Sequence, residues 1–195
     1  MTWGARAGAG RSPIPALPSR AEVHRAAILV TMVSTSSWPV SAAALCLVQQ
    51  RLATAHPQPW RVPAQPYMIG GCFVCFARGG EERGVPGEPG WAGAALVIGA
   101  RTVTSTVVRG VAGYRYAPGL LALREGALLE AAVKALPRVP DVLLVNATGR
   151  DHPRRAGLTL HLGALLGLPT VGSPTDRYWP AGRGRPRRQA RVGPC

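Results

Sequence analysis

The chain has 195 residues, and 23 basic against 9 acidic side chains give it a formal net charge of +14. Apolar residues make up 47% of the chain, which excludes a wholly disordered protein and indicates one domain with a sizeable core. The charge favours a polyanionic partner, nucleic acid ahead of an anionic membrane surface. The alternative explanation of this composition is a GC-rich genome, which enriches a protein in Arg, Ala, Gly and Pro whether or not it binds a polyanion.

The chain lacks the features of a membrane or secreted protein. No apolar run approaches the roughly 18–20 residues of a membrane-spanning helix, and the one at residues 26–33 is far too short. Ser41-Ala42-Ala43 is a poor signal-peptide cleavage site, and the 4 cysteines do not have the spacing of a disulfide framework. We therefore expect a cytoplasmic monomer that does not bind membranes.

Composition divides the chain into three parts. Residues 1–37 show only a possible short helix around 22–33, and Met32 is an alternative start, so we expect a disordered or doubtful extension. Residues 38–176 carry the periodic elements of one domain. Residues 177–195 form an Arg/Gly/Pro tail that is predicted to be disordered; its basic run either binds nucleic acid electrostatically or is simply solvated.

The first half of the domain predicts one helix and three strands. Ser41 can cap a helix whose apolar stripe has three- and four-residue spacing, at Ala44, Leu45, Val48 and Leu52. A proline-rich loop follows the helix. Residues 68–76 are typical of a strand, and residues 92–98 and 101–108 of a hairpin, the second strand of which is rich in Thr and Val.

The second half predicts two helices and two strands. A helix is expected over residues 118–136, with Pro118 in its first turn. Residues 141–145 are almost continuously apolar, as in a buried parallel strand; a helix at about 155–166 and a short strand at 170–171 follow. The order of three strands, helix, strand, helix and strand predicts an α/β domain with a mixed sheet.

The Cys72-x-x-Cys75 pair is a candidate metal or redox site. Zinc needs four ligands, and no second Cys or His pair lies at suitable spacing. Residues three apart on a strand point to opposite faces, which prevents chelation and pairing. We therefore interpret the two residues as buried strand cysteines.

Polar residues gather around the predicted elements of the second half. Glu125 interrupts an apolar helix face, and Asn146, Asp151 and His152 follow a buried strand. Open α/β sheets place ligands beyond the carboxyl ends of their strands. An acid on a helix with polar groups at a strand end is typical of a Mg²⁺ site for phosphodiester chemistry. A satisfied polar turn explains the same residues equally well.

Three motif blocks, in residues 114–126, 140–158 and 161–172, resemble one enzyme family. They read Tyr-Arg-Tyr-Ala-Pro-Gly-Leu-Leu-Ala-Leu-Arg-Glu-Gly, then Pro-Asp-Val-Leu-Leu-Val-Asn-Ala-Thr-Gly-Arg-Asp-His-Pro-Arg-Arg-Ala-Gly-Leu, then His-Leu-Gly-Ala-Leu-Leu-Gly-Leu-Pro-Thr-Val-Gly. The blocks are similar to those of endonuclease V, the deoxyinosine 3′ endonuclease, and the likeness covers roughly residues 38–176. It implies a ribonuclease H-like mixed sheet flanked by helices, in a divergent member incomplete at the C-terminus.

The resemblance also implies an activity. The family cleaves DNA or RNA one phosphodiester bond beyond inosine on its 3′ side, in nucleic-acid repair, using Mg²⁺, for which Mn²⁺ can substitute. The expected partner is therefore DNA or RNA, single-stranded or inosine-containing. Glu125 matches the family's glutamate metal ligand, and His152 matches the histidine that helps to position the attacking water.

The substrate-binding residues follow from the same resemblance. Tyr116, Ala117 and Pro118 fall where the family carries the wedge that parts strands near the lesion. Gly149 and its turn would line the pocket for the flipped base. Arg154 and Arg155, in the same polar segment, are assigned to substrate binding.

The chain departs from the family at its metal-binding positions. The first-strand aspartate is Phe73, the aspartate at the end of the buried strand is Asn146, and the lysine after the last strand is Thr175. One carboxylate rarely holds a catalytic Mg²⁺, and Asp151 is only a weak substitute. We therefore expect cleavage to be weakened or lost. The alternatives are a non-catalytic nucleic-acid-binding module and a decayed product without function.

Overall fold

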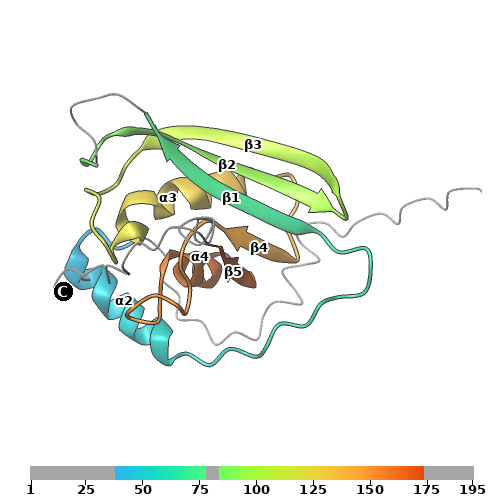
Figure 1. The fold of residues 1–195 in the computed structure, drawn as a ribbon, viewed down its shortest axis with the longest axis horizontal. Helices are drawn as coiled ribbons and strands as arrows, with labels where there is room; N and C mark the ends of the chain where they lie inside the picture. The colour runs from blue at the N-terminus through green and yellow to red at the C-terminus, as the bar shows by residue number, and fades with distance from the viewer. Residues whose placement is uncertain (1–37, 78–83, 174–195) are drawn as a thin grey trace, which may run out of the picture.

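The computed structural model describes residues 38–77 and 84–173, and these form a five-stranded mixed sheet with three helices (Figure 1). The elements in chain order are α2 (Ala42–Thr54), β1 (Ile69–Phe76), β2 (Pro89–Ile98), β3 (Arg101–Val111), α3 (Leu121–Lys134), β4 (Val142–Val145), α4 (Leu158–Leu166) and β5 (Thr170–Gly172). The predicted element order from residue 41 onward is confirmed. The possible helix at 22–33 and the tail at 177–195 lie outside the described residues.

The strands are arranged in the order β3-β2-β1-β4-β5. β1, β2 and β3 pair antiparallel, whereas β4 pairs parallel with both β1 and β5. Because β1, β4 and β5 run in the same direction, their carboxyl ends lie at one edge of the sheet, where polar side chains of an α/β domain are expected to meet ligands.

All three helices contribute to one core. Leu45 of α2, Leu129 of α3 and Leu162 of α4 pack in the same buried cluster as Leu96 and Leu143 of the sheet. Side chains alternate between the faces of a strand, so the helices cover the face that carries these residues. Side chains on the other face are exposed, including Phe73, Val107, Leu144 and Val171.

The predicted starts of two helices were wrong for the same reason. α3 begins at Leu121 rather than at Pro118, because Gly119 has a φ of +81° and breaks the helical path. α4 begins at Leu158 rather than near Arg155, which itself has a φ of +55°. A positive φ is incompatible with a right-handed helix, so both segments stay irregular until after that residue.

The two cysteines of β1 lie on opposite faces of the sheet, as the sequence predicted. Cys72 is buried in the core, where burial raises the pKa of its thiol, whereas Cys75 is exposed. The prediction that both cysteines are buried was therefore wrong for Cys75. The pair has no geometry for chelation.

Trp38 attaches the start of the described chain to α3 and α4. Its ring centroid lies 4.4 Å from that of His161, and its Nε1 donates to the Glu130 carboxylate at 2.7 Å. Gly126 leaves room for the ring, since a Cβ at that position would lie 2.3 Å from a Trp38 ring atom. Three residues after Trp38, the Ser41 hydroxyl caps α2 as predicted, accepting from the Ala44 amide at 3.2 Å.

In the part of the chain that the structure describes, none of the helices is long and apolar enough to cross a bilayer.

Candidate functional site

Phe73 and Asn146 are neighbours at the edge where β4 ends. Cys72 pairs with Val145 in the parallel register, and the Asn146 amide donates to the Cys72 carbonyl at 3.3 Å. Phe73 therefore lies one residue further along β1, next to Asn146, the first residue after β4. The Phe73 side chain is 55% exposed, and its ring lies over Gly93 of β2, where a Cβ would be 3.1 Å from the nearest ring atom.

Glu125 lies near the start of α3 and lines a pocket of about 480 Å³ together with Phe76, Gly84, Tyr116 and Arg124. Burial raises the pKa of the Glu125 carboxyl to about 7, although the adjacent Arg124 cation lowers it. A carboxyl group with this pKa is partly protonated at neutral pH. In its protonated form the group can donate a hydrogen bond.

The segment of the predicted wedge is a surface turn between β3 and α3. The Tyr116 side chain is 64% exposed, while its backbone amide donates to the Gly84 carbonyl at 2.6 Å. The Ala117 carbonyl accepts from Leu120 at 3.0 Å, and Pro118 is exposed. The tyrosine thus combines an accessible ring with a fixed backbone.

The turn after β4 holds its histidine tightly. His152 is only 7% exposed, and its Nδ1 accepts from the Arg154 amide at 3.1 Å. Burial and the Arg154 charge lower the pKa of His152, outweighing a hydrogen bond with the Gly119 backbone. The environment therefore favours the neutral form of the ring. The start of the turn is fixed by the Asp151 carboxylate, which accepts from the Gly149 amide at 2.8 Å.

The two predicted substrate-binding arginines have different environments. Arg154 donates to the Gln49 side chain at 2.6 Å and to the Gly119 carbonyl at 2.8 Å, so its guanidinium joins the turn to α2 and to the loop before α3. Arg155 is exposed. Of the two side chains, only Arg155 is presented to solvent without these internal contacts.

The residues that the resemblance assigns to metal binding do not form a donor set for a catalytic Mg²⁺. Phe73 has no donor atom, Asn146 offers at most a neutral oxygen, and Glu125 is the single carboxylate among the three. Among the described residues, no three His, Cys, Asp or Glu side chains lie close enough to hold a metal ion. The site as it stands does not fit that ion.

Sequence reasoning gave no role to two buried polar residues that make hydrogen bonds beside the candidate site. Arg124 is 5% exposed and pairs with Glu88, and Gln49 is buried against the turn after β4. Arg124 stands in the first motif block, and it is also a charged residue between the buried Leu123 and Leu128 in the stripe of α3.

Together the strand order, the acid on α3 and the polar edge of the sheet define a ribonuclease H-like α/β protein. The chain belongs to the endonuclease V family, whose family model matches residues 67–192. That range includes most of the segment that was predicted to be a disordered tail; the domain boundaries remain predictions.

Curated relatives support this assignment. Endonuclease V of Xanthomonas campestris is 32% identical over 145 residues, which cover 73% of this chain and 58% of the relative. Endonuclease V of Streptomyces coelicolor is 45% identical over 84 residues, which cover 42% of this chain and 36% of the relative. The chain thus spans less than two thirds of the length of either relative.

Solved structures show the same fold. Endonuclease V of Streptomyces avermitilis matches with a TM-score of 0.57 and 33% identity, over 73% of this chain and 61% of that one. The catalytic domain of human endonuclease V matches with a TM-score of 0.55 and 27% identity, over 69% and 58%. Endonuclease V of Ciona intestinalis, solved with a DNA containing an inosine, matches with a TM-score of 0.57 and 19% identity, over 67% and 55%.

Proposed function

We propose that this protein binds inosine-containing DNA or RNA and that its metal-dependent cleavage 3′ to inosine is severely weakened or absent. The observation that carries the proposal is the presence of Phe73 on β1 and of Asn146 directly after β4, at the two positions where the family resemblance expects aspartates. We also propose that the protein is a cytoplasmic monomer and that it acts in nucleic-acid repair.

The loss of charge at these two positions weakens metal binding. Mg²⁺ takes hard oxygen ligands, and protein carboxylates with substrate phosphates usually supply them. Phe73 and Asn146 in place of two aspartates remove two negative charges and leave Glu125 as the single carboxylate among the three expected ligands. The metal would otherwise stabilise the attacking and leaving oxygens, and without it the phosphodiester bond is hydrolysed very slowly.

Nucleic-acid binding depends less than cleavage on the two replaced aspartates. The Tyr116 ring is 64% exposed on a fixed turn, and an exposed aromatic ring can stack on any base. Arg155 adds an exposed cation near Gly149 and its turn. The Ciona intestinalis relative, which has the same fold, was solved with an inosine-containing DNA, and we extend that substrate to this chain.

A cleavage assay with restored ligands tests the catalytic part. We expect almost no product from inosine-containing single-stranded DNA or RNA with Mg²⁺ or Mn²⁺. The double variant Phe73→Asp/Asn146→Asp should gain activity, and adding Glu125→Gln should remove that gain. Turnover by the unaltered chain that disappears in Glu125→Gln alone would refute the proposed loss of cleavage.

A binding assay tests the recognition part. Fluorescence anisotropy in EDTA should show tighter binding to an inosine oligonucleotide than to the adenine one, with affinity falling by about 0.7 log units per phosphate contact for each log unit of salt. Equal affinity for both oligonucleotides contradicts inosine recognition. A non-cooperative thermal melt of the full chain would instead support a decayed product, and light scattering tests the monomer.

A further inference from the structure

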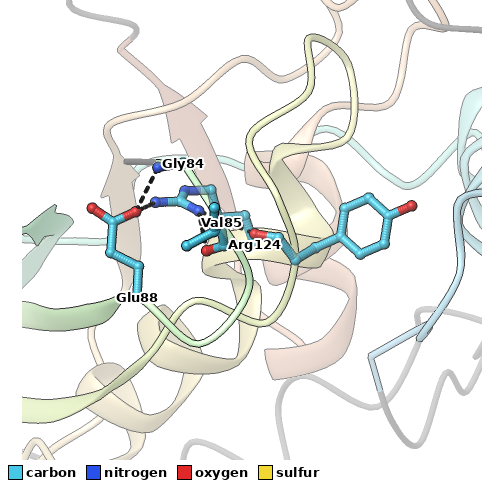
Figure 2. Close-up of polar contacts among 5 residues, drawn as sticks. Gly84, Val85, Glu88 and Arg124 are labelled. Atoms are coloured by element: carbon cyan, nitrogen blue, oxygen red, sulfur yellow. Dashed lines mark hydrogen bonds and ion pairs between the residues drawn. The ribbon is translucent and has the colours of Figure 1, made fainter. Parts of the chain in front are cut away.

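Three segments meet at the buried Arg124, in the place that Figure 2 shows. Arg124 is on α3 and only 5% exposed. Around it lie residues 84–88, which lead into β2, and residues 112–116, which follow β3. The sequence resemblance gave this arginine no role, and the proposed function uses only its neighbours Tyr116 and Glu125.

Both ends of the guanidinium are engaged. Its Nη2 pairs with the Glu88 carboxylate, and its Nη1 donates to the Val85 carbonyl at 3.2 Å and to the Tyr114 carbonyl at 3.0 Å (Figure 2). Its carbon Cζ lies 4.0 Å from the centroid of the Phe76 ring. A buried cation is tolerated when an anion, carbonyl groups and an aromatic face compensate for its lost hydration.

Two routes connect Arg124 to Tyr116. In the first, the Glu88 oxygen that pairs with Arg124 also accepts from the Gly84 amide at 2.8 Å, and the Gly84 carbonyl accepts from the Tyr116 amide at 2.6 Å. In the second, Arg124 holds the carbonyl of Tyr114, two residues before Tyr116. Gly84 has a φ of +78°, which residues with a side chain rarely adopt, so glycine is suited to the turn at position 84.

Backbone hydrogen bonds close the same arrangement. Gly87 donates to Ala112 at 2.8 Å, Ala112 donates to Glu88 at 2.8 Å, and Gly113 donates to the Arg124 carbonyl at 3.0 Å. The walls of the pocket next to Glu125 are therefore built from segments that Arg124 holds together.

We propose that Arg124 is a positioning residue for nucleic-acid binding: it holds residues 84–88 and 114–116 against α3 and so places Tyr116 at the pocket next to Glu125. The inference rests on the proposed function. Arg124 acts through Tyr116 and does not itself contact the nucleic acid. Lysine cannot replace it, because a single ammonium group lacks the planar fork that reaches a carboxylate and two carbonyls at once.

A double-mutant cycle in EDTA tests this inference by anisotropy, with the full chain and an inosine-containing single-stranded DNA. Arg124→Met should weaken binding about tenfold, a coupling in the range found for residues that share a network. In a Tyr116→Ala background the same change should have no further effect. Arg124→Lys should recover little, and Lys134→Met, which removes a cation from an exposed pair on the same helix, should leave binding unchanged.

A merely structural role gives a different result. If Arg124 only supports the fold, Arg124→Met should weaken binding by the same factor in the parent chain and in the Tyr116→Ala background. Such additivity would overturn the inference. Thr106→Val, which removes the hydrogen bond from Thr106 to the Ala132 carbonyl, supplies a variant destabilised elsewhere and should bind normally. If Arg124→Met does not fold, Glu88→Gln keeps the shape, removes the charge of the pair and should show the same dependence on Tyr116.

Amide hydrogen exchange separates this inference from the proposed function. The Tyr116 amide should exchange faster in the Arg124 or Glu88 variant than in the parent chain, and unchanged exchange would overturn the positioning role. If the parent chain binds inosine and adenine oligonucleotides equally, the inosine proposal fails, whereas the exchange result still decides whether Arg124 holds Tyr116 in place.

Discussion

Protonation of His161 should destabilise the fold as the pH falls. This α4 residue is fully buried, and within the described part of the chain neither ring nitrogen has a hydrogen-bond partner. Burial lowers the pKa of His161 from 6.5 to about 4, although the Glu130 charge acts in the opposite direction. Between these two pH values the unfolded chain binds a proton at this position and the folded chain does not. Proton uptake therefore favours unfolding.

The size of the effect follows from the two pKa values. The free energy of unfolding should fall by up to about 1.4 kcal/mol per pH unit between pH 6.5 and pH 4, and by about 2 kcal/mol between pH 7 and pH 5. Below pH 4 both states are protonated and the loss levels off. The raised pKa of Glu125 contributes a slope of opposite sign, so the pH dependence of the parent chain alone does not isolate His161.

Comparison with His161→Leu removes this ambiguity, because Glu125 is present in both proteins. Urea unfolding at pH 5, 6 and 7 should show that the parent chain loses about 2 kcal/mol relative to the variant on going from pH 7 to pH 5. Packing differences shift the variant by the same amount at every pH. His56→Leu, at an exposed position after α2, is the control and should run parallel to the parent. Parallel curves for His161→Leu would refute the reasoning.

Three further substitutions test the packing. Gly126→Ala should destabilise the fold by about 1–3 kcal/mol although alanine has the better helix propensity, because the new Cβ would lie 2.3 Å from the Trp38 ring. Urea unfolding followed by tryptophan fluorescence measures this loss, and an unchanged stability would contradict the packing of Trp38 on Gly126. Leu143→Ala should cost about 2–5 kcal/mol by opening a cavity in the core between the sheet and the helices, and a loss below 1 kcal/mol would argue against its burial. Ser41→Ala should cost about 1 kcal/mol through the lost cap of α2, whereas Ser41→Asp should retain most of the stability in thermal melts.

The fold was largely predictable from local sequence patterns, and the errors of the prediction are confined to single positions. Alternating and continuous apolar runs predicted all five strands, and helical spacing predicted three helices. The helix starts at Pro118 and near Arg155 were wrong because the positive φ values of Gly119 and Arg155 cannot be read from hydrophobic spacing. The exposure of Cys75 was missed because nothing in the sequence of β1 shows that this face of the sheet is open.

The candidate site was predictable only where its residues belong to one motif. Glu125 and Asn146 stand out as polar residues in apolar elements, and the resemblance located Phe73. The arrangement around Arg124 was not predictable, because its partner Glu88 lies 36 residues away in a loop that has no distinctive pattern. Contacts between loops depend on how strands pair, and the sequence alone does not specify that pairing in enough detail.

The position of Phe73 over Gly93 has a consequence for the proposed Phe73→Asp variant. An aromatic ring lying across a strand glycine shields a backbone that has no side chain of its own, and such pairs stabilise sheets. Phe73→Asp therefore exposes the β2 backbone to water at the same time as it supplies a carboxylate. A carboxylate at this position and the present packing of the sheet therefore make competing demands, and we expect Phe73→Asp to be less stable than the parent chain.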